Sequence, residues 1–75
     1  MLNVKVRKPV DPTRDAAVRE ALGRAESELG SRGRVVLRAS GTEPVIRVMV
    51  EGEDRHQVDT LAGRLADAVR SSFGQ

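Results

Sequence analysis

The sequence contains no cysteine, no tryptophan and no tyrosine, and it has one phenylalanine and one histidine. Without cysteine, the chain can form neither a disulfide framework nor a thiolate metal site. A single histidine also leaves it short of the donors that a zinc cluster needs. The scarcity of aromatic side chains removes the stacking platform on which single-strand binders depend, so we expect no nucleic-acid partner and no metal or other cofactor within this chain.

Long apolar runs are also absent. No stretch approaches the ~20 apolar residues that span a bilayer, and the N-terminus lacks the apolar core of a signal peptide. The charged residues comprise 13 Lys and Arg against 11 Asp and Glu, a net charge of +2. Most of them are interleaved along the predicted helices, which is typical of solvated faces rather than of a nucleic-acid-binding surface. These features predict a soluble, cytoplasmic protein with no membrane partner.

At 75 residues the chain is predicted to form one domain, residues 1–75, near the lower size limit for a self-sufficient core. Apolar–polar alternation predicts strands over residues 2–6, 34–39 and 45–51. Asp11-Pro12 is predicted to cap and open a helix that Gly30 ends, and Asp54 with Gln57 forms a predicted capping box for a second helix.

Aliphatic residues at helical spacing mark one face of each predicted helix. The marked residues are Val18, Ala21, Leu22, Ala25 and Leu29, then Val58, Leu61, Ala62, Leu65, Ala68 and Val69. Two amphipathic helices and three alternating strands can share a single core only if both helices cover one sheet face. We therefore predict an α+β fold of order β-α-β-β-α, with an antiparallel sheet and two helices packed on one face.

The segment 38–50 contains the residues most suggestive of function. Ser40, Gly41 and Thr42 form a short loop that Arg38 and Arg47 flank. Backbone amides of a tight turn can bind an oxyanion, and each guanidinium can hold it through two hydrogen bonds. A hairpin placing both arginines near one end of the sheet would bring these groups together, so the sequence predicts a phosphate-binding loop.

The same residues also fit other interpretations. Arg38 and Arg47 could form ordinary surface ion pairs, which contribute little, and Ser40 could be a nucleophile, although no base is placed to activate it. Glu43 could position an arginine, contact a sugar hydroxyl or serve only the loop. The Gly-x-x-Gly run that begins at Gly30 joins a helix to a strand, whereas an RNA-binding KH loop joins two helices, so a turn is predicted there.

The run Arg38-Ala-Ser-Gly-Thr-Glu-Pro-Val-Ile-Arg-Val-Met-Val-Glu51 closely resembles the signature of the last domain of α-D-phosphohexomutases. The resemblance covers essentially the whole chain and implies a fold similar to the TATA-box-binding-protein type. It also implies that the loop binds the phosphate of the substrate that is not transferred, through Arg38, Ser40, Gly41, Thr42 and Arg47, with no catalytic residue here. Ala39 departs from the proline of many relatives.

The continuation Ile46–Glu51 is most similar to family members that act on hexosamine phosphates. This likeness implies a parent enzyme that interconverts glucosamine 6-phosphate and glucosamine 1-phosphate for amino-sugar nucleotide and peptidoglycan synthesis. Such enzymes have four domains, and the first three carry the phosphorylated serine, the Mg²⁺ loop and the sugar-recognition loop. None of those motifs occurs here, so we expect a C-terminal domain that is inactive alone. The alternatives are a phosphomannomutase or phosphoglucomutase domain, or a stand-alone phosphate- or nucleic-acid-binding module.

Overall fold

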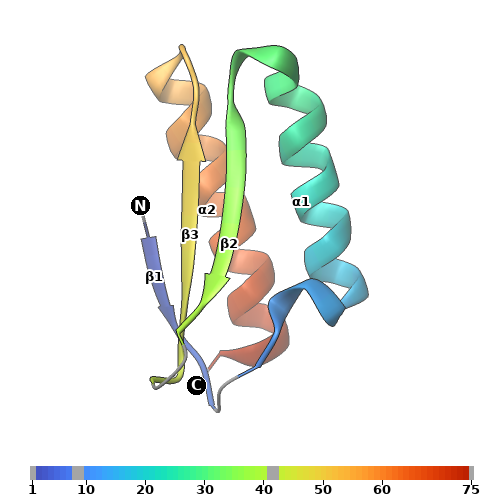
Figure 1. Cartoon of the computed structure of the whole chain (residues 1–75), viewed down its shortest axis with the longest axis vertical. Coiled ribbons are helices and arrows are strands. Elements are labelled where there is room, and N and C mark those ends of the chain that lie inside the picture. Colours follow the sequence, from blue (N-terminus) through green and yellow to red (C-terminus); the bar gives the residue numbers. More distant parts are fainter. Residues whose placement is uncertain (1, 8–9, 41–42, 75) are drawn as a thin grey trace.

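The computed structural model describes residues 2–7, 10–40 and 43–74. They form a three-stranded sheet and two long helices in the order β-α-β-β-α (Figure 1), which confirms the predicted α+β class. The elements are β1 (Leu2–Lys5), α1 (Ala16–Leu29), β2 (Arg34–Ala39), β3 (Val45–Glu51) and α2 (Arg55–Phe73). Short 3₁₀ turns cover Pro12–Arg14 and Gly30–Arg32.

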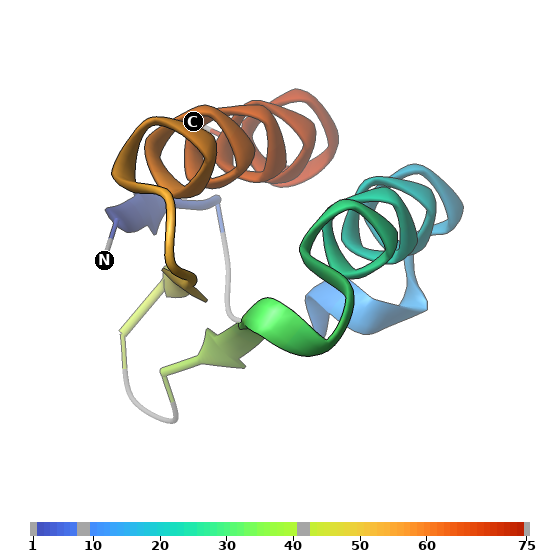
Figure 2. The same ribbon diagram turned by 90° about the horizontal axis from the view of Figure 1, so that it is seen from above.

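The sheet is antiparallel throughout, with strand order β1-β3-β2. Both helices lie on the same side of it, α2 over β1 and β3 and α1 beside β2 (Figure 2). No helix among the described residues covers the opposite face, which we call the open face. Successive side chains of a strand alternate between the two faces, so every second residue of each strand belongs to it. Its residues are Asn3, Lys5, Arg34, Val36, Arg38, Val45, Arg47, Met49 and Glu51.

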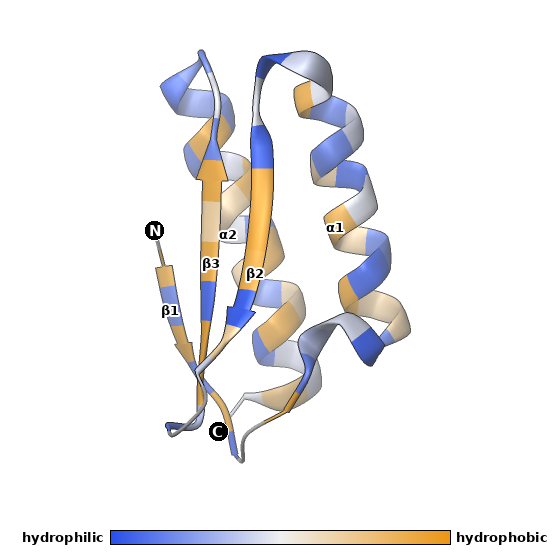
Figure 3. Cartoon of the chain, in the orientation of Figure 1, coloured by the Kyte–Doolittle hydropathy of each residue, from blue (hydrophilic) through white to orange (hydrophobic). Residues whose placement is uncertain are grey.

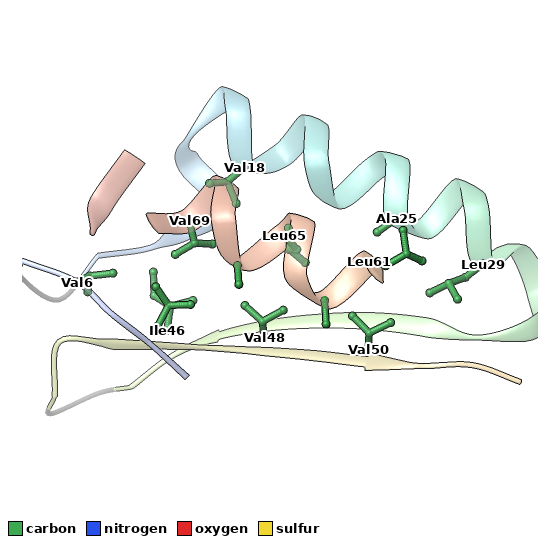
Figure 4. Packing of buried hydrophobic residues seen from close by; sticks show 13 residues of the cluster. Val6, Val18, Ala25, Leu29, Ile46, Val48, Val50, Leu61, Leu65 and Val69 are labelled. Atoms are coloured by element: carbon green, nitrogen blue, oxygen red, sulfur yellow. The ribbon is translucent and has the colours of Figure 1, made fainter. Parts of the chain in front are cut away.

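The core fills the space between the helices and the covered face of the sheet (Figure 4). Figure 3 shows the pattern behind it, with apolar residues on the strands and on the inner stripe of each helix. Ile46, Val48 and Val50 of the central strand β3 project into this layer. The other buried apolar residues are Val4, Val6, Val18, Ala25, Leu29, Leu61, Ala62, Leu65, Ala66 and Val69.

The first helix begins later than the sequence predicts. Asp11 and Pro12 open a 3₁₀ turn in which the Asp11 carboxylate accepts from the Thr13 amide at 3.0 Å. Asp15 is the N-cap of α1, because its carboxylate accepts from the Val18 amide at 3.0 Å. This hydrogen bond, helped by one from the Ser72 hydroxyl, holds the pKa of Asp15 below its usual value, so the cap stays ionised.

The predicted capping box of the second helix is only half formed. Asp54 accepts from the amides of His56 and Gln57, as a cap should. The Gln57 side chain does not return to Asp54 but donates to the Glu28 carbonyl at 3.1 Å, which ties the two helices together. Gly30 ends α1 as predicted, with a φ of 58° that suits glycine.

Smaller differences concern the core and the end of the first strand. Ala68 is only half-buried, whereas Ala66, not selected from the sequence, is buried. Val6 lies beyond β1 and forms an isolated bridge with Gly74, because the chain there turns from β3 toward the end of α2. In the part of the chain that the structure describes, no helix combines the length and apolar character needed to cross a membrane.

Candidate phosphate-binding site

Arg38 and Arg47 lie directly opposite each other. The register of the β2–β3 hairpin pairs them, and both side chains are exposed on the open face, near the end of the sheet at which the hairpin loop lies. The hairpin predicted from the sequence therefore brings the two arginines together as expected. Within the described ranges, neither guanidinium forms an ion pair or a hydrogen bond.

The pairing of Arg38 with Arg47 is electrostatically unfavourable unless an anion binds between their side chains. Like charges directly opposite each other on adjacent strands destabilise a sheet. At the other end of the same face, Arg34 is paired with Glu51 across the same two strands, with Nε–Oε2 and Nη2–Oε1 distances of 3.0 and 3.3 Å. The hairpin can thus accommodate an acid opposite an arginine, yet it presents two cations beside the loop. A bound oxyanion would neutralise them.

Backbone hydrogen bonds hold both ends of the loop. The Ser40 amide donates to the Val45 carbonyl at 3.0 Å, which extends the β2–β3 pairing by one residue. The Glu43 amide donates to Ser40 Oγ at 3.2 Å. Because that hydroxyl oxygen acts as an acceptor, its hydrogen is left to donate to a ligand. On the far side, the Pro44 carbonyl accepts from the Val6 amide at 2.8 Å, which anchors the loop to the first strand.

The other residues that the sequence singled out are Gly41, Thr42, Glu43, His56 and Gly30. Gly41 and Thr42 lie outside the described residues, so their predicted contacts stay predictions. Glu43 is exposed, and its carboxylate pairs with neither arginine among the described residues. His56 lies exposed in the first turn of α2, and Gly30 begins a 3₁₀ turn between α1 and β2, as predicted for both.

The described side chains of the site lie at the surface, since Arg38 and Arg47 are both exposed. A groove between α1 and α2, lined by residues such as Ala21, Arg24, Glu28 and Leu61, contains none of the loop residues. An exposed phosphate site needs no enclosed pocket, because charge and backbone amides provide the binding. Among the described residues, no three His, Asp or Glu side chains lie together in a way that could hold a metal ion.

Sequence reasoning missed two residues beside this site. The register places Asn3 opposite Arg47 and Lys5 opposite Val45, both exposed on the open face. The order of the strands, which brings β1 next to β3, could not be read from the alternation pattern. Asn3 did carry one weak signal, because asparagine is depleted in strands.

Comparison with known proteins shows which family the chain belongs to. The sequence profile of the family described as "Phosphoglucomutase/phosphomannomutase, C-terminal domain" matches residues 1–68. A protein named phosphoglucosamine mutase from Erwinia tasmaniensis is 56% identical over 71 residues, which are 95% of this chain and 16% of that protein.

Two further proteins of the same name give similar values. Those from Edwardsiella ictaluri and Sodalis glossinidius are 51% and 53% identical, each over 72 residues, which are 96% of this chain and 16% of the relative. The chain thus spans 16% of the length of these relatives. Taken with the match to the profile, this similarity shows that the chain belongs to the C-terminal domain family of the phosphoglucomutases and phosphomannomutases.

Proposed function

We propose that this domain binds the phosphate that is not transferred in a phosphohexomutase reaction, and that the substrate is glucosamine 6-phosphate or glucosamine 1-phosphate. The observation that carries the proposal is the cross-strand pair Arg38 and Arg47 beside the loop, whose guanidinium groups have no ion pair or hydrogen bond among the described residues. Two guanidinium groups and the Ser40 hydroxyl offer donors that a phosphate dianion accepts, and the predicted contacts of Gly41 and Thr42 would add backbone amides. The names of the relatives favour the amino sugar over mannose or glucose phosphates.

In this proposal the domain contributes positioning rather than chemistry. Holding one phosphate fixes the distance and direction of the far end of the sugar, so that the other end meets the reacting group of the parent enzyme. Binding energy from such a remote group can raise turnover when it is used to orient the substrate. The phosphorylated serine and Mg²⁺ that the family resemblance implies would lie in other domains of the parent, and we assign no catalytic residue here.

The arrangement also suits a substrate that must be bound in two orientations. In a mutase, either end of the sugar carries the fixed phosphate at different stages of the reaction. Charged donors such as Arg38 and Arg47 recognise the phosphate itself, which is the same group in both orientations. A site built from phosphate donors therefore accepts both orientations.

An NMR titration of the 75-residue chain with inorganic phosphate tests the binding site. Charge-assisted hydrogen bonds contribute roughly 1.5–3 kcal/mol each, and ordering costs leave a modest net affinity. We expect weak saturable binding that shifts the amide signals of Ser40, Gly41 and Thr42 first, together with the Arg38 and Arg47 side-chain signals.

The control for this titration is chloride at equal ionic strength, which should not give the same saturable shifts. Shifts centred on Arg32 and Arg55, which are exposed and away from the loop, would indicate nonspecific attraction to basic side chains. That result would favour the alternative of a general anion-binding module and would contradict the proposed site.

A further inference from the structure

The first strand lies beside the candidate site, although none of its residues belongs to the loop. In the sheet, Asn3 pairs with Arg47, which pairs on its other side with Arg38. These three exposed residues form one row across the open face. Because adjacent strands are about 4.8 Å apart, the row spans about 10 Å, so a ligand held between the two arginines extends easily to β1.

A second row lies closer to the loop. Lys5 pairs with Val45, and the Ser40 amide is bonded to the Val45 carbonyl at 3.0 Å from the opposite side. Lys5 is exposed and, among the described residues, has no ion pair or side-chain hydrogen bond. Lys5 and Arg47 are diagonal neighbours on adjacent strands, and the Cα atoms of such neighbours are about 7–8 Å apart. The open face therefore presents three cations at neighbouring positions of its three strands, Lys5 on β1, Arg47 on β3 and Arg38 on β2.

The Asn3 side chain is exposed on the open face, on the residue that pairs with Arg47. Asparagine is disfavoured in strands, and among the described residues the side-chain amide of Asn3 forms no hydrogen bond. A side-chain amide can both donate to and accept from a hydroxyl, which is the chemistry of sugar recognition.

We propose that β1 completes a hexose-phosphate site on the open face, in which Lys5 provides a third positive charge for the phosphate and Asn3 hydrogen-bonds a hydroxyl of the sugar. The proposal rests on the proposed function, because it assumes that the loop holds the phosphate. It adds that the domain contacts the sugar as well as the phosphate. The Val6–Pro44 hydrogen bond supports it, since it fixes the end of β1 against the loop.

The test compares two ligands, inorganic phosphate and glucosamine 6-phosphate, in NMR or calorimetric titrations of the chain at low ionic strength. Lys5→Gln is expected to weaken both ligands about threefold to fivefold, with the difference shrinking as salt screens the charges. Asn3→Ala is expected to leave phosphate binding unchanged and to weaken glucosamine 6-phosphate about threefold to tenfold, the effect of one neutral hydrogen bond.

Two further variants serve as controls. Arg32→Gln removes one charge at the opposite end of β2 and reports the effect of net charge alone. Asn3→Val removes the amide while introducing a residue that strands favour, so it keeps the test valid if Asn3→Ala is poorly folded. Both are expected to bind inorganic phosphate with nearly the affinity of the original chain.

Each outcome is decisive. If Asn3→Ala and Asn3→Val leave the ratio of the two affinities unchanged, Asn3 does not contact the sugar. If Lys5→Gln weakens phosphate no more than Arg32→Gln, Lys5 is only a distant charge. Either result overturns that part of the inference while the loop still binds phosphate. Absence of phosphate binding at the loop in the original chain would instead overturn the proposed function, and the inference with it.

Discussion

Arg47→Ala in the full-length parent enzyme is expected to lower kcat/KM by about 10- to 100-fold. Removing one charged hydrogen-bonding partner of a phosphate costs roughly 1.5–3 kcal/mol, and each 1.36 kcal/mol corresponds to a factor of ten. Because the fixed phosphate orients the sugar as well as holding it, both kcat and KM should change. Steady-state kinetics with glucosamine 1-phosphate measures the effect.

The same substitution should barely alter stability of the 75-residue chain. Arg47 is exposed, has no partner among the described residues, and faces another cation across the hairpin. Relief of that repulsion offsets the small loss of packing by its side chain. Arg32→Ala in the parent provides the matched control and should retain activity. If Arg47→Ala unfolds the chain, its guanidinium has a structural role and the phosphate contact must be reassigned to Arg38.

Leu65→Ala is expected to lower the free energy of unfolding strongly. Leu65 is 1% exposed and lies on α2, facing the sheet within the core (Figure 4). Truncating a buried leucine typically costs 2–5 kcal/mol, and a domain of this size has a total stability of roughly 4–11 kcal/mol. At about 5 °C per kcal/mol, the midpoint of thermal unfolding should fall by roughly 10–25 °C.

The control is the same substitution at the one large hydrophobic residue that is exposed among the described residues. Leu2 is 42% exposed at the beginning of β1, so Leu2→Ala should shift the midpoint by only a few degrees. Circular dichroism during heating measures both variants. Equal losses from the two substitutions would contradict the packing of α2 on the covered face of the sheet.

The sequence predicted the elements whose signals are local. Strands β2 and β3 have the predicted bounds. Alternation along β3 leaves one register that buries Ile46, Val48 and Val50. The start of α1 was wrong by several residues. Asp11 and Asp15 both have the chemistry of a helix cap, and only the three-dimensional path of the chain decides which of them begins the longer helix.

The candidate site was only partly predictable. The composition of the loop and its two arginines pointed to phosphate, and the hairpin placed them together as expected. The strand order β1-β3-β2 was not predicted, because no local signal in a strand fixes which strand lies beside it. For that reason Asn3 and Lys5 could be associated with the site only after the register was known.

The most direct test is a crystal structure of the parent enzyme with glucosamine 6-phosphate bound. The phosphate should lie within hydrogen-bonding distance of the guanidinium groups of Arg38 and Arg47 and of the Ser40 hydroxyl, with the sugar extending over the open face toward β1. A phosphate held entirely by other domains, with Arg38 and Arg47 paired to carboxylates from those domains, would contradict the proposed function.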